Sequence, residues 1–172
     1  MDWQLRRASA GDAAALSLVA GAAFLETFAG VLPGDDIVAH CANHSSVAKF
    51  ADWAADPGSI ATLALHPHGG APIGYTLLTA PDFPIPTSPG DIELKRIYAL
   101  ASTHGTGLGP ALMTRALADA AALGHARVLL GVHPGNMRAR RFYERHGFAV
   151  IGERVFRVGT QRITDPIYAL NL

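Results

Sequence analysis

The chain has little of three features that define common protein classes: cysteine, net charge and long apolar runs. Its 172 residues include one cysteine, Cys41, which excludes an internal disulfide and favours a reducing, cytoplasmic setting. Fourteen Lys and Arg residues balance fourteen Asp and Glu residues, so nucleic acid is disfavoured as a partner. The N-terminus carries no signal-peptide core and no apolar run approaches the ~20 residues that cross a bilayer, so we expect no membrane partner.

The composition is that of a folded domain. Apolar residues make up 49% of the sequence and charged residues 16%, which supplies a core and argues against disorder. The length suits one domain, and no repeat, low-complexity tract or linker divides the chain. We therefore expect a single domain over residues 1–172.

Apolar patterning and turn residues predict alternating strands and helices. The order predicts an α/β (α+β) fold with helices on both faces of a sheet. The expected strands cover residues 3–7, 59–65, 72–78, 91–100, 127–132, 148–151 and 164–170, and the expected helices cover 9–28, 35–44, 46–55, 107–123 and 136–145.

A glycine-rich turn joins the expected strand at 91–100 to the expected helix at 107–123. It holds Gly105, Gly107 and Gly109, and bare amides at a helix N-terminus attract phosphate. A dinucleotide fingerprint fails, because the sixth position from Gly105 is Pro110 and the turn lies past mid-chain. The turn predicts an anion site, with a plain strand-to-helix connection as the alternative.

Two segments together resemble the GNAT superfamily of N-acetyltransferases. His104-x-x-Gly107-x-Gly109 is similar to the family's turn, in which Arg or Gln usually stands first. Residues 136–148 are similar to its helix signature, Asn-x-x-Ala-x-x-x-Tyr-x-x-x-Gly-Phe, with every named position in register. The resemblance implies a largely antiparallel mixed sheet of six to seven strands with a splayed central pair.

The resemblance also implies that the chain binds acetyl-CoA as acyl donor. In the family, the turn holds the diphosphate, the strand before it binds pantetheine and the acetyl carbonyl, and the helix signature completes the site. A neutral His104 would leave more of the diphosphate to the backbone, and Pro110 has no amide to donate to it. The implied cofactor-binding residues are Ile97, Tyr98, Ala99, Leu100, His104, Gly105, Thr106, Gly107, Leu108, Gly109, Asn136, Ala139 and Tyr143.

Two residues are candidates for acid and base catalysis of acetyl transfer to an amine. By the resemblance, Tyr143 protonates the departing thiolate, which a phenol with a pKa near ~10 matches; the alternative is a packing aromatic. Glu93 stands about where some GNATs place a general base. Its alternative is a solvated or salt-bridged strand residue beside Lys95 and Arg96.

The acceptor is less well defined. Residues 93–98 and 156–165 resemble spermidine/spermine-type acetyltransferases, which implies a small amine acceptor such as a polyamine, with Glu26 as a candidate for its ammonium group. A non-catalytic acyl-CoA sensor or interaction module and a protein or peptide N-acetyltransferase remain as alternatives. A homodimer is one open option. No Cys or carboxylate joins the histidines at ligand spacing, so we expect no metal.

Overall fold

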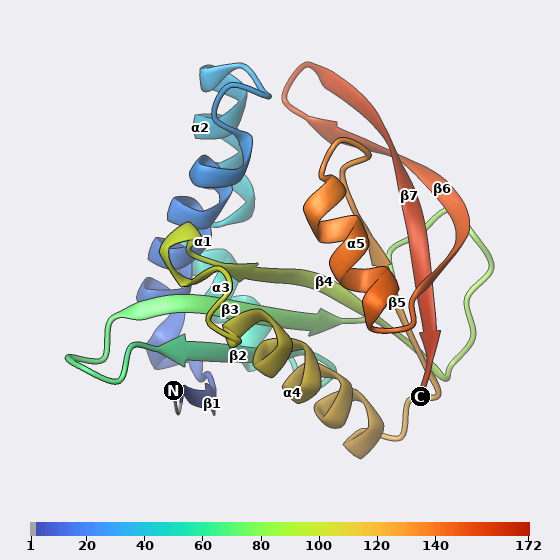
Figure 1. The fold of residues 1–172 in the computed structure, drawn as a ribbon, viewed down its shortest axis with the longest axis horizontal. Helices are drawn as coiled ribbons and strands as arrows, with labels where there is room; N and C mark the ends of the chain where they lie inside the picture. The colour runs from blue at the N-terminus through green and yellow to red at the C-terminus, as the bar shows by residue number, and fades with distance from the viewer. Residues whose placement is uncertain (1–2) are drawn as a thin grey trace.

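The computed structural model describes residues 3–172. A seven-stranded sheet runs in the order β1-β2-β3-β4-β5-β7-β6 and carries helices on both sides (Figure 1). The strands are β1 (Gln4–Arg7), β2 (Ile60–Leu65), β3 (Pro72–Thr79), β4 (Asp91–Ala99), β5 (Arg127–Gly131), β6 (Ala149–Val158) and β7 (Gln161–Asn171). The helices are α1 (Ala13–Phe28), α2 (Gly34–His44), α3 (Val47–Ala55), α4 (Leu108–Ala122) and α5 (Met137–Arg145), with short 3-10 turns η1 (Ala10–Asp12) and η2 (Ala101–Thr103).

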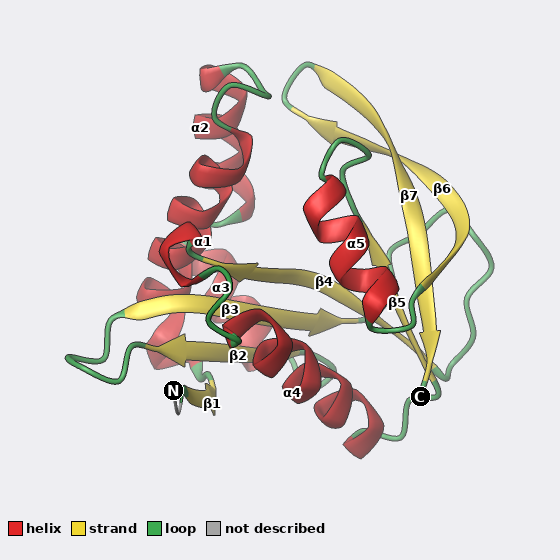
Figure 2. Cartoon of the chain, in the orientation of Figure 1, coloured by secondary structure: helices red, strands yellow, loops and turns green. Residues whose placement is uncertain are grey.

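The sheet separates two helical layers (Figure 2). On one face, α4 and α5 pack on a cluster that includes Val128, Leu130 and Tyr168. On the other face, α1 and α3 pack on Leu63 and Tyr75 of β2 and β3. Strand side chains alternate between faces, and β2, β3 and β4 contribute to both clusters. This confirms the predicted mixed fold with helices on both faces.

The central strands β4 and β5 are paired at one end only. They run parallel, and their pairing covers Asp91–Glu93 against Arg127–Leu129. All other neighbouring strands in the sheet pair antiparallel. Beyond Glu93, β4 pairs with β3 alone, and the two central strands diverge in Figure 1. The predicted splayed pair is thus confirmed, and one edge of β4 has free backbone groups.

The last two strands are longer than predicted. The sequence predicts strands at 148–151 and 164–170, whereas β6 and β7 form one long antiparallel hairpin that pairs to Val158 and Gln161. The residues added to β6 alternate between outward and inward positions, with Arg154, Phe156 and Val158 directed inward. Charged residues in this stretch conceal the alternation in the sequence.

The first helical stretch also requires a correction. Residues Ala10–Phe28 form 19 helical residues with a mean hydropathy of 1.3, which is long and apolar enough to cross a membrane by length and composition. The prediction that no apolar run approaches such a length was therefore wrong. Leu16, Val19 and Ala20 of this stretch are buried against the sheet, as in the core helix of a folded domain.

Candidate active site

The glycine turn has the backbone geometry of an anion site. Gly105 and Gly107 have φ angles of 79° and 94°, which favour glycine. Within residues 3–172 the amides of Gly105 and Gly107 donate no backbone hydrogen bond. The amides of Leu108 and Gly109 lie in the first turn of α4, where no intrahelical acceptor exists. Pro110 adds no donor, so the free amides cluster at the start of α4.

His104 holds an arginine at this turn. Its Nδ1 contacts a guanidinium nitrogen of Arg138, and its Nε2 lies 3.2 Å from the carbonyl oxygen of Ala99. A guanidinium can only donate, so Nδ1 accepts and Nε2 carries the hydrogen. Burial, and then the charge of Arg138, lower the pKa of His104. The ring is therefore neutral near pH 7, and Arg138 is the cation beside the turn.

The helix signature places its residues along α5. The Asn136 side-chain oxygen accepts from the Ala139 amide at 3.1 Å and caps the helix, which leaves its NH₂ group free. Tyr143 is 8% exposed and packs against Phe148 and Tyr168. Its hydroxyl forms no hydrogen bond with the described part of the chain, and burial raises its pKa. Tyr143 thus stays protonated over the physiological pH range.

The end of β4 lies between the turn and Tyr143. Ile97, Tyr98 and Ala99 pair with β3, and the Leu100 amide donates to Ile73. Their other edge faces the splay, since the pairing with β5 ends at Glu93. Ile97 also packs against the cluster that contains Tyr143. The structure therefore brings the predicted strand and the predicted helix residue together.

Glu93 lies at the closed end of the splay, with 1% of its surface exposed. It accepts a hydrogen bond from the Asp82 amide at 3.0 Å. Lys95 Nζ and Arg154 Nη1 lie 3.5 and 3.6 Å from its carboxylate oxygens. Burial raises the pKa of Glu93, and these partners oppose the rise. The carboxylate is thus buried and ion-paired, with a raised pKa.

Glu26 lies apart from Glu93. Its carboxylate accepts a hydrogen bond from the Ala101 amide at 2.8 Å, at the start of η2 and two residues after the end of β4. This contact ties α1 to the connection that leads to the glycine turn.

Sequence reasoning missed three residues of this region. They are Arg138, Arg154 and Asp165. Arg154 and Asp165 face each other across the β6–β7 pairing, with Nε and Oδ2 3.8 Å apart. No signal in the sequence singles out Arg154, because its inward position depends on the pairing of β6 with β7.

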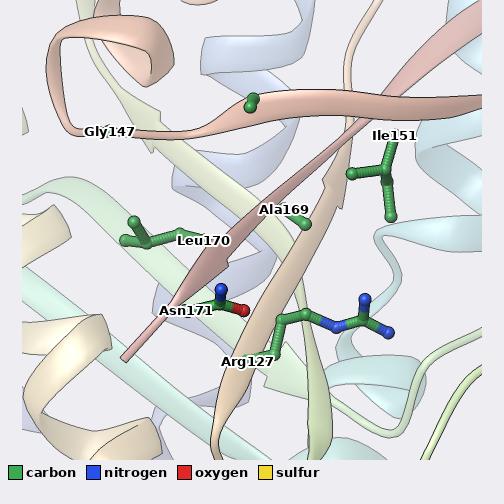
Figure 3. Close-up of a pocket in the computed structure, with 7 residues that line it drawn as sticks. Arg127, Gly147, Ile151, Ala169, Leu170 and Asn171 are labelled. Carbon is green, nitrogen blue, oxygen red and sulfur yellow. The ribbon is translucent and has the colours of Figure 1, made fainter.

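A hollow of about 380 Å³ lies at the start of β5, at the end of this strand away from the open splay (Figure 3). Arg127, which lines it, is held by Asp91 at 2.7 and 2.8 Å. None of the predicted site residues lines it. No group of three or more His, Cys, Asp or Glu side chains within residues 3–172 is placed to hold a metal. The lining residues are Arg127, Gly147, Ala149, Ile151, Ala169, Leu170 and Asn171.

Comparison with solved structures supports the fold. An N-acetyltransferase, PaiA, from Thermoplasma acidophilum in complex with coenzyme A matches with a TM-score of 0.81 at 21% identity, covering 100% of both chains. The ribosomal-protein-S18-alanine N-acetyltransferase from Escherichia coli matches with a TM-score of 0.71 at 17% identity, covering 99% of this chain and 94% of its own. At these identities the matches show a shared fold.

Sequence comparison shows the family. An uncharacterized N-acetyltransferase of Mycobacterium tuberculosis is 35% identical over 161 residues, which is 94% of this chain and 98% of the relative. A relative from Mycobacterium bovis, with the same description, gives the same figures. The model of the Acetyltransferase (GNAT) family matches residues 26–148. With its splayed sheet, glycine turn and helix signature, the chain belongs to the GNAT family of acetyltransferases.

Proposed function

We propose that this protein transfers the acetyl group of acetyl-CoA to a primary amine of a small molecule. The observation that carries the proposal is the early end of the β4–β5 pairing at Glu93 and Leu129. It leaves a free β4 edge between the glycine turn and Tyr143. The single cysteine favours a cytoplasmic setting, and a homodimer stays an open option.

The residues at the splay suit an acyl-CoA. The free amides of the turn and the nearby Arg138 suit a diphosphate. The unpaired backbone of β4 suits the amide groups of pantetheine, and the free NH₂ of Asn136 offers a further donor. Acetyl-CoA supplies an activated thioester, and the protein's own residues orient it and move protons.

Two residues are proposed to move the protons. The acceptor nitrogen attacks the thioester carbonyl carbon, and the carbon–sulfur bond breaks. The proton lost from the amine passes to Glu93, directly or through water, and the hydroxyl of Tyr143 protonates the leaving thiolate. A buried carboxyl with a raised pKa and a buried, protonated phenol suit these roles.

Three alternatives concern the identity of the acceptor or whether there is a reaction at all. The resemblance of the tail to spermidine/spermine-type enzymes supports a polyamine, with Glu26 as an ammonium ligand. The protein could instead acetylate protein or peptide amines, or sense acyl-CoA without catalysis.

A thiol-release assay separates these readings. Acetyl-CoA is supplied with panels of polyamines, amino acids and peptides, and free CoA is measured. Turnover on at least one small amine supports the proposal, and turnover on peptides alone replaces it with protein acetylation. Tight CoA binding with no turnover on any amine would show the sensor.

A further inference from the structure

Three ionisable side chains share the sheet face opposite α4 and α5. Val128 and Leu130 of β5 point to α4 and α5, so their neighbours Leu129 and Gly131 point the other way. Glu93 pairs with Leu129, and Asp165 lies two residues before Ile167, which pairs with Gly131. Arg154 is directly opposite Asp165. We call Glu93, Arg154 and Asp165 the acceptor-face cluster.

Gly131 gives Arg154 its place in this cluster. A Cβ on Gly131 would lie 2.6 Å from Cζ of Arg154, so the guanidinium rests directly on the β5 backbone. Phe83 and Phe156 hold its other sides, with ring centroids 4.9 and 5.1 Å from Cζ. Gly131 lies two residues beyond Leu129, the last β5 residue that pairs with β4. Arg154 is therefore a fixed cation where the splay begins.

Two atoms of the cluster, one hydrogen-bond donor and one hydrogen-bond acceptor, have no hydrogen-bond partner among the described residues. Nε of Arg154 and Oδ1 of Asp165 are buried and form no hydrogen bond with any described residue. The 3.8 Å between Arg154 and Asp165, and the 3.6 Å between Arg154 and Glu93, exceed hydrogen-bond length. Asp165 is only 3% exposed. Buried polar atoms are nearly always paired, so a ligand that offers both a donor and an acceptor would satisfy this site.

We propose that the acceptor is an α-amino acid, whose amino group is received by Asp165 and whose carboxylate is received by Arg154. This inference rests on the proposed function and names its substrate class. An α-amino acid presents its amine and carboxylate close together, as the orphaned atoms require. A protonated polyamine offers no hydrogen-bond acceptor to Arg154. Glu93 remains the base and, since it lies on the other side of Arg154, takes the amine proton through water.

Matched pairs of acceptors test the inference. Glycine, L-alanine, L-methionine and L-phenylalanine are each compared with the amine that lacks the carboxylate. Binding is measured by calorimetry on the CoA-saturated protein, and acetylation by thiol release. We expect at least one amino acid to be favoured about 10- to 100-fold over its matched amine, the size of one hydrogen bond to a charged group.

Three variants connect this preference to the cluster. Arg154→Gln should lower binding of the amino acid far more than binding of the matched amine, and so remove the preference. Gly131→Ala should do the same with every charge retained, because it displaces the guanidinium. Arg157→Gln removes an exposed arginine from the same strand and should leave the preference intact. Thermal melts followed by circular dichroism verify that each variant is folded.

The outcomes separate the inference from the proposed function. Acetylation of spermidine or of the matched amines in preference to every amino acid overturns the inference and leaves the acetyltransferase proposal standing. Preference for peptides with a free N-terminus overturns it in favour of a protein substrate. Amino-acid binding that depends on Arg154, with no turnover, supports the site while the proposed function fails. Absence of both binding and turnover overturns the inference.

Discussion

Arg138 contacts His104 from the start of α5, and the two side chains join that helix to the glycine turn. The histidine ring is also anchored on the Ala99 carbonyl. A neutral histidine thus stands where the family usually has Arg or Gln, and the cation comes from a different element. The two positions are 34 residues apart in the chain.

We predict that Arg138→Gln weakens CoA binding by about 10-fold or more, because one charged donor to the diphosphate is lost. Isothermal titration at two salt concentrations measures the loss, and the salt dependence should also fall. The matched control is Arg162→Gln, which removes an exposed arginine from β7. His104→Arg in the Arg138→Gln background should recover binding. An unchanged affinity of Arg138→Gln for CoA would show that this arginine does not contribute to CoA binding.

Tyr143→Phe should lower turnover by about 100-fold or more and leave CoA affinity almost unchanged, because only a proton donor is removed. Steady-state kinetics and CoA titration measure the two quantities. Tyr168→Phe is the control, since it removes a hydroxyl from the same core that is bonded to Glu144 at 2.9 Å. Equal turnover in Tyr143→Phe and the unmodified protein would exclude the acid role.

The pH dependence of kcat/KM should reveal the ionisation of Glu93. Its pKa is raised above the ordinary 4.5 by burial, so a base at this position becomes active as pH rises through a value above 4.5. We expect an acidic limb of kcat/KM at that higher pH, and its loss in Glu93→Gln together with most of the activity. A limb that persists in Glu93→Gln would assign the base to another group.

The Asp91–Arg127 ion pair should stabilise the closed end of the splay. Arg127 lowers the pKa of Asp91 from 3.8 to about 2, so this stabilisation is complete above pH 3.8 and is lost as pH falls through about 2. Asp91→Asn should cost about 1–3 kcal/mol near pH 7. Urea unfolding between pH 2 and 7 should show a smaller pH dependence in the variant. An unchanged pH dependence would contradict this assignment.

Glu26→Gln distinguishes two roles for this residue. An ammonium ligand would change the KM of the acceptor, whereas a brace of η2 would change the KM of acetyl-CoA. The hydrogen bond to the Ala101 amide leads us to expect the larger change in acetyl-CoA. A larger change in the KM of the acceptor would instead support Glu26 as the ligand of its ammonium group.

Local patterns predicted most of the fold and the two segments that form the candidate acyl-CoA site. The glycine turn and the α5 signature are short segments whose spacing is fixed by a turn and a helix. Arg154 could not be found this way, because its place depends on the long-range pairing of β6 with β7 and on the absent side chain of Gly131. The contact of Arg138 with His104 likewise depends on how α5 packs beside the turn.

Alternation along β5 has a consequence for how such a protein can diverge. Leu130 points into the core beneath α4 and α5, while the adjacent Gly131 opens the other face to Arg154. Consecutive residues therefore belong to different surfaces of one sheet. If the proposed acceptor site is correct, substitutions in β6 and β7 change the acceptor while the elements proposed to bind acetyl-CoA stay the same.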